Sequence, residues 1–447
     1  MKAPLGLDTL EQHLEEFIST GESYLRDARA GRSYRHCLHD PTFLKRSDSR
    51  EPHILQDVCL SIDVGGTHTK AALVDFSVDT SGDWSILFDI KNEVFLSRDA
   101  TEPPIVTFAE NLARHVRDSL QSRSYTPSRI RSIAIVWSNQ LQARSFESSS
   151  ARGVTGLIMG ISAGSYRKDE WFVKDLQDGF DLGDLFRSSL GAHGLRSEVF
   201  IIGNDTAFTL TALPGARGGV VASSGGNCTD VGTGDRDLDL IFNTEIGGLY
   251  KVAPALLSDG DRALVAQSGA TIALEDLLSG KWLPKIFEHH ISVAAARGVT
   301  DLCGISDTIR NQSEIFTTHD LCALLARREL SPVIAGLKGC SSDACEALSE
   351  IAVAVTRRAG TAAACLCYFS IYNQIVSGIK SFSIALDSAM ARHVPGYFEV
   401  LDRTFQSILE KRQVKGHITL MRPVQCGDGH EISVPLLGAT FAGALWK

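Results

Sequence analysis

The segment Ile201-Ile202-Gly203-Asn204-Asp205-Thr206 continues an apolar run that begins at Val199 and ends it with polar residues. The apolar run predicts a buried strand, and Thr206 is of a residue type that caps helices, here one predicted over residues 207–213. Open α/β sheets bind ligands beyond the carboxyl ends of their strands, so Asn204 and Asp205 are candidates for a functional site. Taken alone, an Asn-Asp-Thr triplet is more often a helix cap with a polar turn.

The composition favours a folded protein that acts on small molecules. A length of 447 residues suits two or three domains, and the shares of 44% hydrophobic and 22% charged residues are ordinary for globular proteins. The net charge of -9 without a Lys/Arg block argues against a nucleic-acid partner, and no apolar stretch predicts a membrane span. Ten cysteines without a C-x-x-C pair, and no signal-peptide pattern, favour reduced thiols in a cytoplasmic protein.

Residues 58–75 predict a hairpin in which two apolar strands are joined at Gly65-Gly66. The glycines allow a ligand to approach the backbone closely, and backbone N–H groups in such a turn can bind phosphate together with the hydroxyls of Thr67 and Thr69. Asp63 would hold a hydrated Mg²⁺, and Lys70 would neutralise phosphate charge. A plain hairpin needs glycine but none of these polar residues, so the pattern favours a phosphate site.

A second unit of the same kind follows at residues 219–231, where an apolar strand ends at Ser223-Ser224-Gly225-Gly226-Asn227. Two such units predict a duplicated architecture, with two similar α/β lobes facing each other across a cleft and the phosphates between the two turns. Residues 146–164, rich in Ser and Gly, are predicted to form a mobile loop that covers the site.

We predict three parts of the chain. Residues 1–53 form an amphipathic helix, expected over Asp8–Arg29, and a linker at residues 40–53, both packing on the large lobe. Residues 54–203 form the small lobe, completed by a C-terminal helix over residues 436–446. Residues 204–435 form the large lobe.

From about Val58 to its end, the chain resembles the hexokinase family of actin/Hsp70-like sugar kinases. Residues 63–70 and 223–227 are similar to its two phosphate motifs, Asn204-Asp205-Thr206 to the segment that holds the catalytic aspartate, and Asn243-Thr244-Glu245 to a sugar-binding segment. Glu275 matches a second sugar-binding segment, and residues 355–359 match the connecting helix. The resemblance implies an α/β fold of duplicated ribonuclease H-like (actin-like ATPase) domains, with two lobes around a cleft.

The resemblance also implies ATP-dependent phosphoryl transfer to a hexose or related polyol, with ATP and Mg²⁺ as cofactors. Asp205 would be the general base. Carboxylates and amides can make several hydrogen bonds to a polyol, and the implied sugar-binding residues are Ser138, Lys168 or Lys174, Asn204, Asn227, Glu245 and Glu275. The implied ATP- and phosphate-binding residues are Asp63, Gly65, Gly66, Thr67, His68, Thr69, Lys70, Ser223, Ser224, Gly225 and Gly226. The metal would lie near Asp63, through water, and near Asp205.

The chain departs from the family pattern at several positions. His68 and Lys70 replace Asn and Arg, Ser223-Ser224 replaces a Gly-Thr pair, and Asp387-Ser388 lacks the glycine of the adenosine-side motif. The identity of the sugar and the oligomeric state stay open. The departures motivate a second hypothesis, a non-catalytic hexokinase-like sugar sensor or regulator. A third hypothesis is an ATPase that acts on a protein partner. Glu245 and Glu275 argue against it, because an ATPase of that kind does not need sugar-binding acids. The sequence has no G-x-x-x-x-G-K-[ST] run, which argues against a P-loop enzyme.

Overall fold

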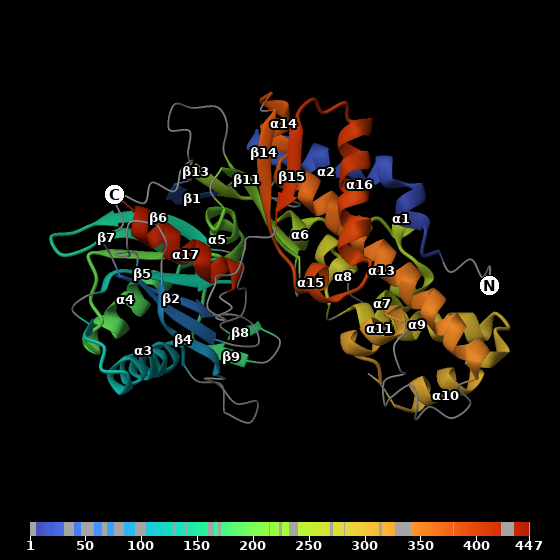
Figure 1. The fold of residues 1–447 in the computed structure, drawn as a ribbon, viewed down its shortest axis with the longest axis horizontal. Helices are drawn as coiled ribbons and strands as arrows, with labels where there is room; N and C mark the ends of the chain where they lie inside the picture. Colours follow the sequence, from blue (N-terminus) through green and yellow to red (C-terminus); the bar gives the residue numbers. More distant parts are fainter. Residues whose placement is uncertain are drawn as a thin grey trace.

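The computed structural model shows two lobes, each a sheet covered by helices (Figure 1). It describes residues 6–30, 40–45, 58–64, 69–75, 85–93, 104–127, 130–138, 141–159, 165–168, 171–213, 215–222, 226–231, 240–268, 271–280, 282–312, 315–326, 341–378, 380–421 and 433–446. Among these residues, no helix combines the length and the apolar character needed to cross a membrane.

The small lobe is built on a seven-stranded sheet in the order β4-β3-β2-β5-β10-β7-β6. Its strands are β2 Val58–Val64, β3 Thr69–Asp75, β4 Ser85–Glu93, β5 Ile130–Trp137, β6 Leu141–Glu147, β7 Arg152–Ile158 and β10 Val199–Asn204. Strands β2, β5 and β10 are parallel neighbours, so their carboxyl ends meet at one edge. A separate hairpin pairs β8 Ser165–Lys168 with β9 Trp171–Lys174.

Helices cover both faces of this sheet. α3 Ile105–Ser122 and α4 Leu182–Ala192 pack on one face, where α3 buries apolar residues at a helical period, such as Phe108, Leu112 and Val116. α5 Asp205–Thr211 and the C-terminal α17 Val434–Leu445 pack on the other face. The central strands β2 and β10 are therefore buried on both faces and are mostly apolar, as is typical of parallel strands.

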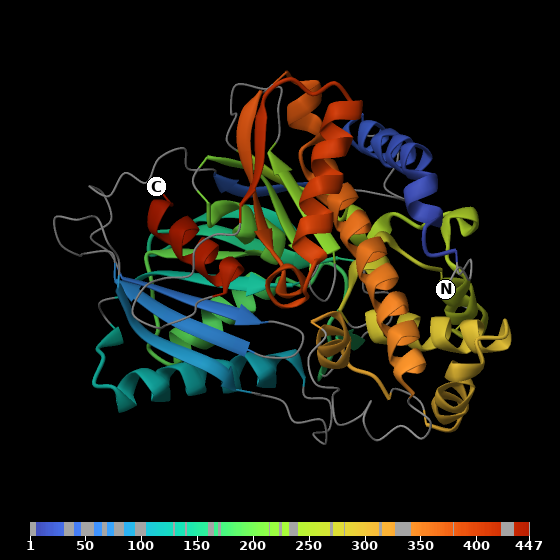
Figure 2. The ribbon, with the colours of Figure 1, turned by 45° about the vertical axis from the view of Figure 1, so that its right-hand side comes forward.

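The large lobe is built on a six-stranded sheet in the order β1-β13-β12-β11-β14-β15. Its strands are β1 Asp40–Lys45, β11 Ala216–Ala222, β12 Gly226–Val231, β13 Leu240–Asn243, β14 Ser381–Asp387 and β15 His417–Met421. The helix α13 Ser342–Ser370 runs through the core of this lobe, and most of the residues in its second half are buried (Figure 2).

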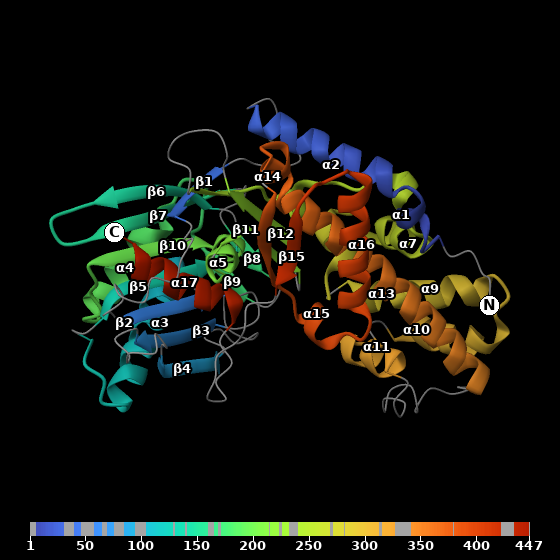
Figure 3. The same ribbon diagram turned by 45° about the horizontal axis from the view of Figure 1, so that its top comes forward.

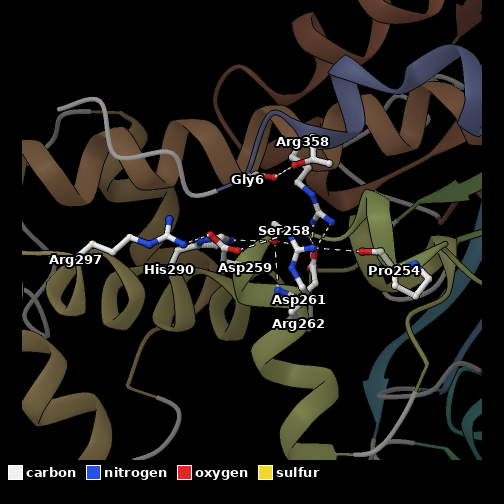
Figure 4. A network of polar contacts seen from close by, with 10 residues as sticks. Gly6, Pro254, Ser258, Asp259, Asp261, Arg262, His290, Arg297 and Arg358 are labelled. Carbon is white, nitrogen blue, oxygen red and sulfur yellow. Dashed lines mark hydrogen bonds and ion pairs between the residues drawn. The ribbon is translucent and has the colours of Figure 1, made fainter.

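Shorter helices surround α13. They are α6 Ile246–Leu249, α7 Asp259–Ser268, α8 Leu274–Leu278, α9 Leu283–Ala296, α10 Cys303–Asn311, α11 Thr318–Leu325, α14 Tyr372–Val376, α15 Ala389–His393 and α16 Tyr397–Lys411, with 3-10 turns at Pro254–Leu256 and Thr300–Leu302. A buried polar network joins α7 and α9 to α13 (Figure 4): Asp261 of α7 pairs with Arg358 of α13, and Ser258, directly before α7, contacts His290 of α9.

The N-terminal helices α1 Thr9–Gln12 and α2 Leu14–Arg29 lie on the large lobe (Figure 3). A side chain at Gly21 would place its Cβ 2.2 Å from the ring of Phe369, so glycine allows α2 to approach α13 closely. Glu22 accepts hydrogen bonds from the Tyr368 hydroxyl (2.7 Å) and from Arg412 Nε (2.9 Å). The domain boundaries at residues 53, 203 and 435 stay a prediction.

The prediction of a linker at residues 40–53 is wrong for residues 40–45. These residues form β1, which pairs antiparallel with β13 and also lies against β6 of the other lobe. Pro41 falls on an edge strand, the position in a sheet that tolerates proline. Strand pairing therefore overrides the local turn signals.

The predicted mobile loop at residues 146–164 is also largely replaced by regular structure. Residues 141–158 form the β6–β7 hairpin, and β7 pairs with β10. The glycines are used for close packing rather than mobility, because a Cβ at Gly153 would lie 1.8 Å from the carbonyl oxygen of Phe200. Residues 160–164 lie outside the described part.

Candidate functional site

The carboxyl ends of three parallel strands bring four of the predicted site residues to one edge of the small-lobe sheet. Trp137 of β5 is in register with Val64 of β2 and with Asn204 of β10. Asp63, one residue before Val64, Ser138, directly after Trp137, and the Asn204-Asp205 pair therefore lie along the same edge. β5 lies between β2 and β10, so Ser138 has Asp63 on one side and Asn204 on the other, although each is more than 60 positions away in the sequence.

Asn204 joins β10 to α5. It is 3% exposed, has an extended backbone, and its Oδ1 accepts a hydrogen bond from the Thr206 backbone N–H at 2.9 Å. The prediction that Thr206 caps the helix is wrong: Asn204 is the N-cap, and the fully buried Thr206 lies within the first turn. Asp205 is the first residue of α5, half-buried, and its Oδ1 also accepts from the Thr206 N–H, at 2.8 Å.

The C-terminal helix α17 supports both ends of this edge. Ser433, its N-cap residue, donates from Oγ to Asp63 Oδ2 at 3.4 Å. Gly438 approaches α5 so closely that a Cβ there would lie 1.6 Å from the carbonyl oxygen of Phe208, and its own carbonyl accepts a hydrogen bond from Thr211 Oγ1 at 2.9 Å. One helix therefore holds the segments that carry Asp63 and Asp205.

The large lobe contributes two acids from neighbouring helices. Glu245 lies two residues after the end of β13 and is the N-cap residue of α6. It is 9% exposed, and its Oε1 accepts a hydrogen bond from Asn243 Nδ2 at 2.6 Å. Glu275 of α8 faces the backbone of α6, because a Cβ at Gly248 would lie 3.4 Å from both of its carboxylate oxygens. Both acids therefore border the same short helix α6.

Lys70 of β3 lies near an acid of the other lobe. Burial raises the pKa of Asp387 at the end of β14, whereas the positive charges of Arg392 and Lys70 act in the opposite direction by favouring the carboxylate. Arg392 is 3.2 Å from Asp387 Oδ1. Ser388 donates from Oγ to the carbonyl of Ala222 at 2.7 Å, which links Asp387 to the end of β11, directly before the predicted second phosphate turn.

Residues 223–430 match the hexokinase family model. The resemblance to the hexokinase family is confirmed. A hexokinase from Schistosoma mansoni complexed with glucose superposes with a TM-score of 0.68 at 14% sequence identity, covering 97% of this chain and 98% of that one. A second hexokinase crystal structure gives a TM-score of 0.68 at 16% identity, covering 98% and 97%. A search of curated protein sequences finds no significant match.

At these identities the structural matches show the fold alone: the chain has the two-lobed, actin-like hexokinase fold, as predicted from its motifs. The motif residues Gly65, Gly66, Thr67 and His68, and the residues Ser223, Ser224 and Gly225, lie outside the described part. The strands that flank both turns are described and pair as hairpins, Val64 with Thr69 and Ala222 with Gly226.

For the three candidate residues Asn227, Lys168 and Lys174, the structure describes only the backbone. Asn227 pairs with Val221 in the β11–β12 hairpin, next to Gly226. Lys168 and Lys174 occupy opposite ends of the β8–β9 hairpin, paired with Trp171 and Ser165. Their roles stay predictions. Among the described residues, no group of three or more His, Cys, Asp or Glu side chains is arranged to hold a metal ion.

The sequence analysis missed two residues that support the candidate site, Ser433, which contacts Asp63, and Gly438, which lets α17 approach α5. Ser433 had a usable signal, since Ser followed by Val and Pro435 is typical of a helix start. Gly438 had none, because its role depends on which helix lies opposite.

Proposed function

We propose that this protein is an ATP-dependent sugar kinase that transfers a phosphoryl group from ATP to a hydroxyl of a hexose or related polyol in the cytoplasm. The observation that carries the proposal is the shared edge of β2, β5 and β10, where the strands that lead to Asp63 and Asp205 lie two strand spacings apart, about 10 Å. That spacing leaves room for a phosphoryl group and its Mg²⁺ between the two carboxylates.

Asp205 is the proposed general base. Its carboxylate takes the proton of the sugar hydroxyl while the hydroxyl oxygen attacks the γ-phosphorus of ATP, and the bond from that phosphorus to the bridging oxygen of ADP breaks. The half-buried position of Asp205 and its hydrogen bond to the Thr206 N–H support the proposal, since both hold the carboxylate in place without covering it.

Sugar recognition is assigned to side chains from both lobes. Asn204 and Ser138 come from the small-lobe edge, and Glu245 and Glu275 from the two sides of α6. Acids and amides fix the orientation of a polyol because each can make more than one hydrogen bond. We assign Asn227 and one of Lys168 and Lys174 to the same sugar on the motif resemblance alone. The glucose named for the Schistosoma mansoni hexokinase structure supports a sugar as substrate.

We assign nucleotide phosphate to the two glycine turns with Lys70, and Mg²⁺ to Asp63, through water, and Asp205. Mg²⁺ in phosphoryl-transfer sites is held by one or two carboxylates together with waters and phosphate oxygens, so two carboxylates are a sufficient protein contribution. When bound, the ion neutralises charge on the transferred phosphoryl group. Asp63 is only 9% exposed and its Oδ2 accepts from Ser433, which fits a carboxylate that acts through a water molecule.

The test is ADP release from purified protein with ATP and Mg²⁺ across hexoses, amino sugars and cyclitols. Release that depends on one sugar class supports the kinase and names its substrate. Sugar binding measured by calorimetry without ADP release would overturn it in favour of a sensor. ATP turnover that is indifferent to every sugar would instead indicate an ATPase acting on a protein partner.

A further inference from the structure

Asn243 and Glu245 form a reciprocal pair at the end of β13. The Asn243 side-chain amide donates from Nδ2 to Glu245 Oε1 at 2.6 Å, and its Oδ1 accepts a hydrogen bond from the Glu245 backbone N–H at 3.3 Å. One side chain therefore contacts both the carboxylate and the main chain of Glu245. Such a pair restrains the direction of the carboxylate as well as its position.

Glu245 has an unusual backbone. Its φ of 48° and ψ of 22° place it in the left-handed region, which residues other than glycine rarely adopt. Such residues persist where the surroundings hold them, and they cluster at functional sites. Thr244, which separates the pair, is fully buried, so the whole segment is enclosed by the fold. The Asn243 side chain supplies one of the restraints on this conformation.

Asn243 is itself held firmly. It is 4% exposed and lies at the end of β13, between β12 and β1, in register with Thr229 on one side and Asp40 on the other. Because strands flank it on both sides, its backbone cannot shift without breaking sheet pairing. Glu245 lies two residues beyond the end of β13, outside the described strand pairing. Asn243 is therefore fixed by the sheet, and its hydrogen bonds restrain Glu245, which lies outside the sheet.

We propose that Asn243 is a positioning residue for sugar binding, which orients the Glu245 carboxylate toward the sugar through its amide. This inference rests on the proposed sugar-kinase function. Asn243 acts through Glu245 and does not itself contact the sugar. Its importance follows from the geometry of α6, which begins after Glu245 and passes Glu275 at Gly248. A rotation at Glu245 changes the alignment of the two acids with respect to each other.

The test is a double-mutant cycle with Asn243→Ala, Glu245→Ala and the double variant, using calorimetric affinity for the sugar that the wild-type protein phosphorylates. Because the substitution removes a hydrogen bond that holds the charged Glu245 carboxylate, we expect Asn243→Ala to weaken sugar affinity by about 10- to 100-fold, with ATP affinity unchanged. In the Glu245→Ala background, the same substitution should have almost no further effect. Full additivity of the two effects would overturn the proposal, because it would show that Asn243 acts independently of Glu245.

Two further variants separate positioning from general stability. Ile241→Val alters the fully buried residue on the same face of β13 and should lower the melting temperature without changing sugar affinity. Asn243→Asp keeps an oxygen for the Glu245 N–H but replaces the amide donor by a negative charge, so we expect a loss at least as large as that of Asn243→Ala. Wild-type affinity in Asn243→Asp would overturn the proposal.

The wild-type measurement keeps the two claims apart. If wild type binds sugar and the effects of Asn243→Ala and Glu245→Ala are fully additive, the kinase proposal stands and only the role of Asn243 is lost. A wild-type protein that binds no sugar overturns the kinase proposal itself, and the role of Asn243 with it.

Discussion

Arg358 and Asp261 form an ion pair that is enclosed in the large lobe, with side chains 2% and 0% exposed. Arg358 Nη1 donates to Asp261 Oδ1 at 3.3 Å, Nη2 donates to Oδ2, and the same Oδ2 accepts from the backbone N–H and the hydroxyl of Ser258, each at 2.8 Å. The pair joins α13, the central helix, to α7.

We expect Arg358→Met to lower the free energy of unfolding by about 3–5 kcal/mol, because it leaves a buried carboxylate without its counter-charge. Denaturant unfolding measures the change. The control is Arg297→Ala, which breaks a half-exposed ion pair with Asp259 (2.8 Å) and should cost less than about 1 kcal/mol. Equal losses in the two variants would contradict the prediction.

The same network makes stability depend on pH through His290. Burial, and then the charge of Arg358, lower the pKa of His290 to about 3, whereas an unfolded histidine titrates near 6.5. Between these values the unfolded chain binds a proton that the folded protein does not bind. The free energy of unfolding therefore falls as the pH falls below about 6.5, by about 1.4 kcal/mol per pH unit for this one group.

The measurement is the free energy of unfolding of wild type and His290→Asn between about pH 7 and about pH 5. We expect His290→Asn to be less stable than wild type near about pH 7. The difference in free energy of unfolding should shrink as the pH falls toward about 5, because only wild type loses stability through His290. Asp259, His289, Arg297 and Arg358 surround the ring and are retained in both proteins. His319→Asn, at an exposed histidine, is the matched control, and the prediction requires a larger change of slope in His290→Asn than in this variant. A constant difference between wild type and His290→Asn would contradict the prediction.

Gly438→Ala tests the contact between α17 and the helix that carries Asp205. The new Cβ would meet the Phe208 carbonyl oxygen, so α17 must move away from α5, at a cost of about 1–3 kcal/mol. We also expect a lower kcat, because α17 and α5 together support Asp63 and Asp205. Thermal unfolding and steady-state kinetics measure both. Gly191→Ala in α4, where no atom lies within 4 Å of the added Cβ, should be neutral or stabilising.

Asp205→Ala tests the proposed general base. We expect kcat to fall by about 10²- to 10⁴-fold while sugar affinity stays within a few-fold of wild type, because the base acts only as the proton moves. Steady-state kinetics with calorimetry separates the two quantities. Asp181→Ala removes a comparable carboxylate, the N-cap of α4, which accepts from the Asp184 N–H at 2.8 Å, and should lower stability but not kcat. A kcat equal to that of wild type in Asp205→Ala would show that Asp205 is not the general base.

The amino-acid sequence was sufficient to predict the secondary structure that carries the motifs. The hairpin of residues 58–75 and the strand ending at Asn204 follow from runs of apolar residues next to glycine or polar residues, a signal that is local in the chain. The two glycine turns predicted a duplicated architecture, and the resemblance of the motifs, in their order, to the hexokinase family implied the two-lobed fold.

Tertiary structure decided those strands and side-chain contacts that depend on segments distant in the chain. Residues 40–45 form a strand because β13 offers unpaired backbone groups, and the glycines near residue 153 lie in a strand because β10 passes within contact distance. The support of Asp63 by Ser433, 370 residues later, and the approach of Gly438 to Phe208 have the same origin. Local sequence determines which conformations a segment prefers, whereas packing against distant segments determines which side chains meet at a site.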